Sequence, residues 1–169
     1  MGKIGAILSL LGVVIAWGLS LPTSFSADFV EKVITPQNRV LIYRGKVYYQ
    51  RERAYWHYTY PTEKKIWITP LGYISYEPDL MQVTISQKPL NLNLQQILDR
   101  AKKVGPHTYI AVVKGRRVQF HYDHYLRDLN YTDELENRVE FNFTNPSTAP
   151  LPPTLFRPKY PADVDKIYQ

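Results

Sequence analysis

The 169-residue sequence contains no cysteine. This absence excludes disulfide frameworks, thiol nucleophiles, zinc ribbons and iron–sulfur sites, and it also excludes a lipid-modified N-terminal cysteine. Several motifs of common enzyme classes are missing as well: Gly-x-Ser-x-Gly, His-Glu-x-x-His, the phosphate-binding loop and Gly-x-Gly-x-x-Gly. Catalysis therefore finds little support in the sequence, and no cofactor is expected.

Glycine is scarce in most of the chain, because four of the eight glycines fall within the first eighteen residues. Aromatic residues are abundant by contrast, and tyrosine, phenylalanine and tryptophan together make up 14% of the sequence. This bias favours strands over helices.

The charge balance is moderately basic. Lysine and arginine number 21 against 15 aspartates and glutamates, which gives a net charge of +6 and a pI near 9.4. Such a charge can steer a protein toward anionic surfaces but does not identify a partner. The basic pairs Lys102-Lys103 and Arg116-Arg117 are too sparse for a nucleic-acid surface, and no nucleic-acid partner is expected.

The first 21 residues have the pattern of an export signal. Lys3 precedes an apolar stretch from Ile4 to Leu21, which is typical of the charged and hydrophobic regions of a secretory signal. Cleavage near Ser20 or Leu21 leaves residues 22–169 as a single exported domain. Because the stretch comes close to the ~20 residues that cross a bilayer, an uncleaved inner-membrane anchor remains an alternative.

The rest of the chain predicts mainly strands, with one helix in the middle. Alternating polar and apolar residues indicate strands over 24–33, 41–49, 53–60, 64–69, 73–76, 80–86, 109–113, 116–122, 125–131 and 138–144. Asn93 can cap an amphipathic helix that runs through Leu94, Ile97 and Ala101 to a stop at Gly105. The proline-rich last 24 residues should be extended and should dock at residues 155–156. One curved antiparallel sheet or barrel fits this pattern, and a two-sheet sandwich is the competing architecture.

Titratable side chains give no convincing site. His121 and His124 lie three residues apart, which on a strand places them on opposite faces and argues against a metal site. Glu77 and Asp79 flank Pro78, as in a solvated turn. A hydrolase would require that folding bring distant Ser, His and Asp side chains together.

Aromatic side chains recur on the inward face of successive strands. Such a face either packs against itself as a filled core or encloses an apolar ligand, and the sequence leaves both readings open.

Five motifs follow one another along the chain: Ser-Phe-x-Ala-x-Phe at 24–29, a glycine two residues before an apolar position at 43–47, an aromatic strand at 54–58 followed by proline, Tyr-x-Pro-x-x-x-Gln at 76–82, and Phe-x-Phe at 141–143 followed by Pro-x-x-Val-Asp at 161–165. In this order they resemble the LolA family, periplasmic carriers that move lipoproteins from the inner to the outer membrane of Gram-negative bacteria. The resemblance covers residues 23–167.

The resemblance implies a mainly β fold: an unclosed antiparallel β-barrel, that is, a strongly curved sheet, with a helical lid. It implies a monomeric, non-enzymatic carrier whose apolar cavity accepts the acyl chains of lipoproteins. The implied partners are an inner-membrane lipoprotein-releasing ABC transporter and, if present, an outer-membrane acceptor. We expect the cavity to be lined by Phe25, Phe29, Tyr43, Val47, Trp56, Tyr58, Ile74, Tyr76, Met81, Val83, Leu94, Ile97, Val139, Phe141 and Phe143.

Two features depart from the family pattern. The family usually carries an Arg-Pro pair six residues before the tryptophan, and its arginine is thought to hold the lid closed. Gln50 stands there in this sequence, which leaves Arg51 and Arg53 nearby as candidates for a lid latch. The helix that precedes the first strand in the family is missing here, unless the uncleaved apolar segment replaces it.

A carrier of this kind has a physical rationale. At ~0.8 kcal/mol per methylene group, exposing three acyl chains to water would cost on the order of 30 kcal/mol, so a lipoprotein cannot cross an aqueous space unaided.

The outer-membrane acceptor of the same fold is itself a lipoprotein and needs an N-terminal cysteine. Since the sequence has no cysteine, this chain is not that acceptor. Two alternatives remain: a membrane-tethered LolA-like module that binds phospholipid or glycolipid, and an exported sandwich with a filled core that binds partners through surface tyrosines.

Overall fold

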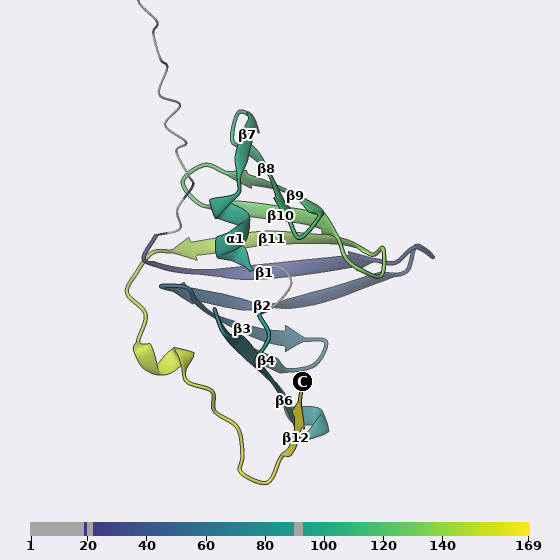
Figure 1. Cartoon of the computed structure of the whole chain (residues 1–169), viewed down its shortest axis with the longest axis vertical. Coiled ribbons are helices and arrows are strands. Elements are labelled where there is room, and N and C mark those ends of the chain that lie inside the picture. The colour runs from purple at the N-terminus through teal and green to yellow at the C-terminus, as the bar shows by residue number, and fades with distance from the viewer. Residues whose placement is uncertain (1–18, 20–21, 90–92) are drawn as a thin grey trace, which may run out of the picture.

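The computed structural model describes residue 19 and residues 22–89 and 93–169 (Figure 1). The expected signal segment over residues 1–21 therefore lies almost wholly outside the described residues. Leu19 packs against the hydrophobic core. Within the described part of the chain, no helix is long and apolar enough to cross a membrane.

The described residues form one open sheet of twelve strands in the order β12-β6-β5-β4-β3-β2-β1-β11-β10-β9-β8-β7. All neighbouring strands are antiparallel except β12 and β6. The strands are β1 (Ser24–Ile34), β2 (Val40–Gln50), β3 (Arg53–Tyr60), β4 (Lys64–Thr69), β5 (Gly72–Glu77), β6 (Gln82–Ser86), β7 (Lys102–Gly105), β8 (Thr108–Val113), β9 (Arg116–Tyr122), β10 (Leu126–Thr132), β11 (Arg138–Ser147) and β12 (Asp165–Tyr168). Because β7 and β12 are the two edges, the sheet is unclosed, which confirms the mainly β fold and excludes the two-sheet sandwich for this part of the chain.

The inner face of the sheet, which carries Phe29, Trp56 and Phe141, holds the larger core. This inner cluster consists of Phe25, Ala27, Phe29, Val47, Tyr49, Ile97, Leu98, Ala111, Val113, Val118, Phe120, Leu126, Leu129, Val139, Phe141 and Phe143. Two of its residues come from helix α1 (Leu94–Asp99), which lies against this face (Figure 1). The inner cluster therefore joins the middle of the sheet to its β7 side and to the helix.

A tight approach of three strands fixes the centre of this face. Phe29 on β1 lies opposite Gly45 on β2, which lies opposite Tyr58 on β3. A Cβ atom at Gly45 would be 2.1 Å from the carbonyl oxygen of His57 and 2.9 Å from the Phe29 ring. Only glycine therefore lets the Phe29 ring cover this point of β2.

The outer face carries a second, smaller core, the outer cluster, which consists of Tyr55, Trp67, Tyr76, Val83, Phe156 and Val164. The chain after β11 forms a short 3-10 helix (Pro153–Phe156) and runs along this side of the sheet to β12 (Figure 1). The Trp67 indole N–H donates a hydrogen bond to the carbonyl oxygen of Leu155 at 3.3 Å. The expected docking of the C-terminal segment at residues 155–156 is thus confirmed.

Three details of the predicted elements are wrong. The helix ends at Asp99, because the residues after it pair with β8 as the edge strand β7 and so satisfy their backbone groups there. The strand expected over 80–86 begins only at Gln82, because Pro78 starts a 3-10 turn that leaves Met81 in the left-handed region with φ 48° and an exposed side chain. Strand β12 was not predicted, because its four residues are all exposed and show no alternation of buried and exposed positions. They are extended because they pair with β6.

Candidate functional site

An apolar pocket lies between α1 and the inner face of the sheet. Its volume is about 190 Å³. Aromatic and aliphatic side chains form most of its wall, and a few polar groups interrupt it. The lining residues are Glu31, Tyr49, Glu52, Ala54, Trp56, Tyr58, Ile66, Ile68, Asn93, Leu94, Ile97, Leu129, Tyr131, Phe141 and Phe143.

The pleat of β3 and β4 aims one set of side chains into this pocket. Ala54 lies opposite Ile68, and Trp56 opposite Ile66, so all four share the inner face. Tyr58 continues the same row. At ~3.3 Å per residue, Ala54 to Tyr58 extends about 13 Å along the strand, so the pocket is elongated parallel to the strands.

Aromatic rings pack against one another in and around the wall of the pocket. The Trp56 ring meets Phe29 at a centroid distance of 5.1 Å and Phe141 at 5.5 Å, both edge to face. Phe141 stacks on Phe143 at 5.9 Å. Such pairs add to the stabilisation from burial alone and hold each ring in one orientation.

Helix α1 covers the pocket with Leu94 and Ile97. Its first turn is capped by the Asn93 side chain, which accepts a hydrogen bond from the Gln95 N–H at 2.8 Å. A helix of six residues is too short to be stable alone, so packing against the sheet holds it in place. The Tyr49 hydroxyl adds a direct bond, since it donates to the Oε1 atom of Gln95.

Glu31 is a half-buried acidic group in the wall of the pocket. Burial raises the pKa of its carboxyl group, although the hydrogen bond from the Tyr58 hydroxyl and the charge of Lys64 both act in the opposite direction. Burial and the nearby Glu31 raise the pKa of Tyr58 well above its ordinary value and that of Tyr131 to about 12. Both phenols are therefore neutral hydrogen-bonding groups at physiological pH.

The structure distributes the expected lining residues among four environments. Six of them line the pocket: Trp56, Tyr58, Leu94, Ile97, Phe141 and Phe143. Four others are buried in the surrounding inner cluster: Phe25, Phe29, Val47 and Val139. Tyr43 lies beside the pocket, with its ring 6.2 Å from that of Tyr58. The remaining four lie elsewhere: Tyr76 and Val83 belong to the outer cluster, Ile74 packs against it, and Met81 is exposed.

The register of β4 and β5 explains why Ile74 and Tyr76 are separate from the pocket. The tight turn pairs Thr69 with Gly72, so Tyr73 follows Ile68 on the inner face and Ile74 follows Trp67 on the outer face. The same rule identifies pocket residues that the sequence analysis missed. Ile66 and Ile68 could have been found from their pairing with β3, whereas Glu31, Tyr49, Glu52, Ala54, Asn93, Leu129 and Tyr131 become neighbours only through the fold.

The two arginines expected near a lid latch lie where β2 turns into β3. Arg51 and Arg53 are exposed at the turn between β2 and β3, where Arg51 has φ 48°. Within the described ranges, neither side chain forms a hydrogen bond or ion pair with α1. Tyr49, four residues before Arg53, makes the contact with the helix instead.

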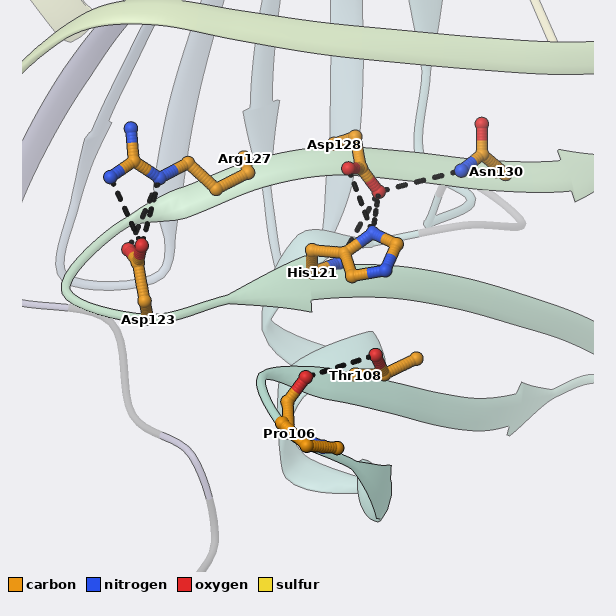
Figure 2. Close-up of polar contacts among 7 residues, drawn as sticks. All are labelled: Pro106, Thr108, His121, Asp123, Arg127, Asp128 and Asn130. Atoms are coloured by element: carbon orange, nitrogen blue, oxygen red, sulfur yellow. Dashed lines mark hydrogen bonds and ion pairs between the residues drawn. The ribbon is translucent and has the colours of Figure 1, made fainter.

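A polar cluster lies on the outer face of β9 and β10, away from the pocket (Figure 2). The Nδ1 atom of His121 is 2.8 Å from Asp128 Oδ2, and the Asn130 amide donates to Asp128 Oδ1 at 3.4 Å. Figure 2 shows Thr108 on the neighbouring strand, where its hydroxyl donates to the carbonyl oxygen of Pro106 at 3.2 Å. Among the residues that the structure describes, no hydroxyl group is hydrogen-bonded to His121 or Asp128. No cluster of three metal-ligating side chains occurs among the residues the structure describes.

Comparisons with known proteins identify relatives of the chain and of its fold. The family model "Outer membrane lipoprotein carrier protein LolA" matches residues 21–159. An outer-membrane lipoprotein carrier protein of Wolinella succinogenes is 28% identical over 131 residues, which cover 76% of each chain. One of Campylobacter jejuni is 27% identical over 165 residues, which cover 93% of each chain. A solved structure of an uncharacterized conserved protein from Thermus thermophilus has a TM-score of 0.56 at 14% identity, covers 88% of this chain and 92% of its own, and shares the fold.

Proposed function

Because the chain belongs to the LolA family of outer membrane lipoprotein carrier proteins, we propose that it binds the acyl chains of lipoproteins in the pocket beneath α1 and carries them through the periplasm from the inner to the outer membrane. The observation that supports this role is the pocket itself, whose wall of aromatic and aliphatic side chains is covered by one short helix. Residues 1–21 then act as the export signal and residues 22–169 as the single carrier domain.

The size of the pocket indicates how it is loaded. Its volume of about 190 Å³ is below the roughly 300–1,000 Å³ of ordinary small-molecule pockets. Acyl chains therefore need more room than this conformation offers, and they enter when α1 moves away from the sheet. Helix α1 is suited to this movement, because it is short and depends on packing with its neighbours.

The carrier receives its cargo from an inner-membrane ABC transporter and passes it to an outer-membrane acceptor where one exists. A wall of aromatic and aliphatic groups holds acyl chains mainly by burying apolar surface. Such binding is not directional, so a transfer partner with a similar apolar site can compete for the chains. The net charge of +6 favours encounter with acidic partners and anionic membranes.

A binding titration tests the proposal. The full-length protein, expressed with its own N-terminal segment and purified from the periplasm, is titrated with a fluorescent diacyl lipopeptide. We expect saturable binding that is abolished by Trp56→Glu and retained by Leu71→Glu, which places the same charge on a side chain that is 81% exposed in a turn.

Three results would contradict the proposal. A folded protein that binds neither lipopeptide nor free lipid is an interaction domain with a filled core. A protein that binds phospholipid or glycolipid but not lipopeptide is a lipid-binding module. Equal loss of binding in both variants would place the ligand outside the pocket.

A further inference from the structure

Glu31 interrupts an otherwise apolar row on β1. The inner-face residues of this strand are Phe25, Ala27, Phe29, Glu31 and Val33, and Glu31 alone carries charge. Its backbone is opposite Tyr43 on β2 and Phe141 on β11, so its side chain enters the pocket between them. A carboxyl group therefore occupies a position where the strand pattern calls for an apolar side chain.

The carboxyl group of Glu31 has no paired cation among the described residues. The neighbouring Lys64 lies 3.8 Å from Glu77, its own ion-pair partner. A half-buried carboxylate without a counter-ion is unfavourable, and buried charges in proteins are ordinarily paired. A desolvated titratable group at the wall of a pocket is accordingly a candidate for ligand binding.

The surroundings of Glu31 favour a cationic ligand over an anionic one. Tyr58 donates one hydrogen bond to the carboxylate, which has about four lone-pair sites, so acceptor capacity remains. A primary ammonium group offers three donors and the missing positive charge. A phosphate or carboxylate at the same place would repel Glu31.

We propose that Glu31 binds a free ammonium group of the cargo that lies next to its acyl chains, and so makes the carrier selective for lipids with an unmodified amine. This inference rests on the proposed function and narrows its substrate. The acylated terminal residue of a lipoprotein has an α-amino group beside its diacylglyceryl group, and this amine is either free or itself acylated. Only the free form can pair with Glu31, and its chains then extend along β3 toward Ala54 and the helix.

A second carboxylate provides the matched control. Glu136 is exposed in the turn between β10 and β11 and does not line the pocket. Replacing Glu136 by glutamine removes the same charge from the protein and leaves the wall of the pocket unchanged. Glu31→Gln keeps an oxygen that can accept the hydrogen bond from Tyr58.

The experiment measures the affinities of the full-length protein for two fluorescent lipopeptides with the same two acyl chains. One has a free α-amino group, and in the other this group is acetylated. We expect the wild-type protein to bind the free amine about tenfold more tightly at pH 7.5. Glu31→Gln should reduce this ratio to near one through weaker binding of the free amine, whereas Glu136→Gln should leave it unchanged.

Equal wild-type affinities for the two lipopeptides would overturn the proposal, and this comparison requires no variant to fold. A preference that survives in Glu31→Gln would overturn the role of Glu31. If neither lipopeptide binds, the proposed lipoprotein carriage fails instead. A further measurement compares the affinities for phosphatidylethanolamine and for its N-acetyl form. If the protein binds no lipopeptide but prefers the free phosphatidylethanolamine amine, and Glu31→Gln removes this preference, the ammonium site is supported and the cargo is a phospholipid.

Discussion

The Tyr49 hydroxyl donates a hydrogen bond to the Gln95 side chain and thereby joins strand β2 to helix α1. The same oxygen accepts a hydrogen bond from the Glu52 N–H at 3.3 Å, so one phenol links the helix to the turn between β2 and β3. The family's lid arginine would stand one residue after Tyr49, where this chain has Gln50. Tyr49 is thus placed to hold α1 against the sheet.

Removing this hydroxyl should loosen the helix without disturbing the core. Tyr49→Phe keeps a ring that is only 5% exposed and deletes two hydrogen bonds, the one donated to Gln95 and the one accepted from the Glu52 N–H, each of which is worth about 0.5–1.5 kcal/mol. We expect faster hydrogen exchange in residues 95–99 and lipopeptide dissociation about two- to tenfold faster than in the wild type. Tyr48→Phe is the control, because Tyr48 stacks on Tyr55 at 5.7 Å on the outer side. Equal effects of the two substitutions would show that Tyr49 does not act as a latch.

Local patterns in the sequence were enough to predict individual strands. The strands over 53–60 and 64–69 have the predicted bounds, because alternation defines them and Pro61 separates them. Asn93 was identified as the helix cap for a similar local reason. These features depend on neighbours in the sequence, which a single chain displays directly.

The relation between strands was harder to predict. Alternation shows that Ile74 and Tyr76 share a face of β5, but only the pairing of Thr69 with Gly72 shows that this is the outer face. The end of the expected helix is instead strand β7, because these residues pair with β8. The local sequence pattern of residues 94–105 does not show this pairing. The pocket was therefore predicted in part: its β3 and β11 residues follow from local pattern, whereas the contact of Glu31 with Tyr58 depends on the three-strand register.

Gly45 should be intolerant of even the smallest side chain. In Gly45→Ala the new methyl group would meet the backbone carbonyl of His57, so β2 and β3 would have to separate. We expect a loss of about 1–3 kcal/mol in the free energy of unfolding, measured by urea denaturation. Gly105→Ala is the control, because its nearest neighbour would be 3.6 Å away at Thr108. Similar losses in the two variants would argue against the close approach of these strands.

The outer cluster should stabilise the fold without binding the ligand. Phe156→Ala removes a buried ring that packs with Tyr55 and Trp67 on the face opposite the pocket. The expected cost is about 3–5 kcal/mol in unfolding free energy, with lipopeptide affinity unchanged at temperatures where the variant is folded. Denaturation and titration of the same preparation measure both quantities. A loss of affinity in the folded variant would instead indicate that the C-terminal segment controls the pocket.

Ionisation of Glu31 should weaken the fold at neutral pH. Its pKa is raised in the folded protein, so between its ordinary value near 4.5 and the raised value the folded state holds a proton that the unfolded state has released. The free energy of unfolding therefore falls as the pH rises through this window, and the loss is complete above the raised pKa. The groups around Glu31 are Tyr43 from β2, Tyr58 from β3, Lys64 from β4 and Tyr131 from β10.

Glu31→Gln should consequently be more stable than the wild type at pH 7, by on the order of 1 kcal/mol. The difference should vanish below about pH 4, where the wild-type carboxyl group is protonated in both states. Urea denaturation from pH 3.5 to 8 measures the difference in unfolding free energy between the variant and the wild type. Carboxylates with a lowered pKa, such as Glu63, contribute equally to both proteins, so their effect cancels in this difference. A stability gain that is constant across this range would mean that Glu31 strains the pocket by its shape and not by its charge.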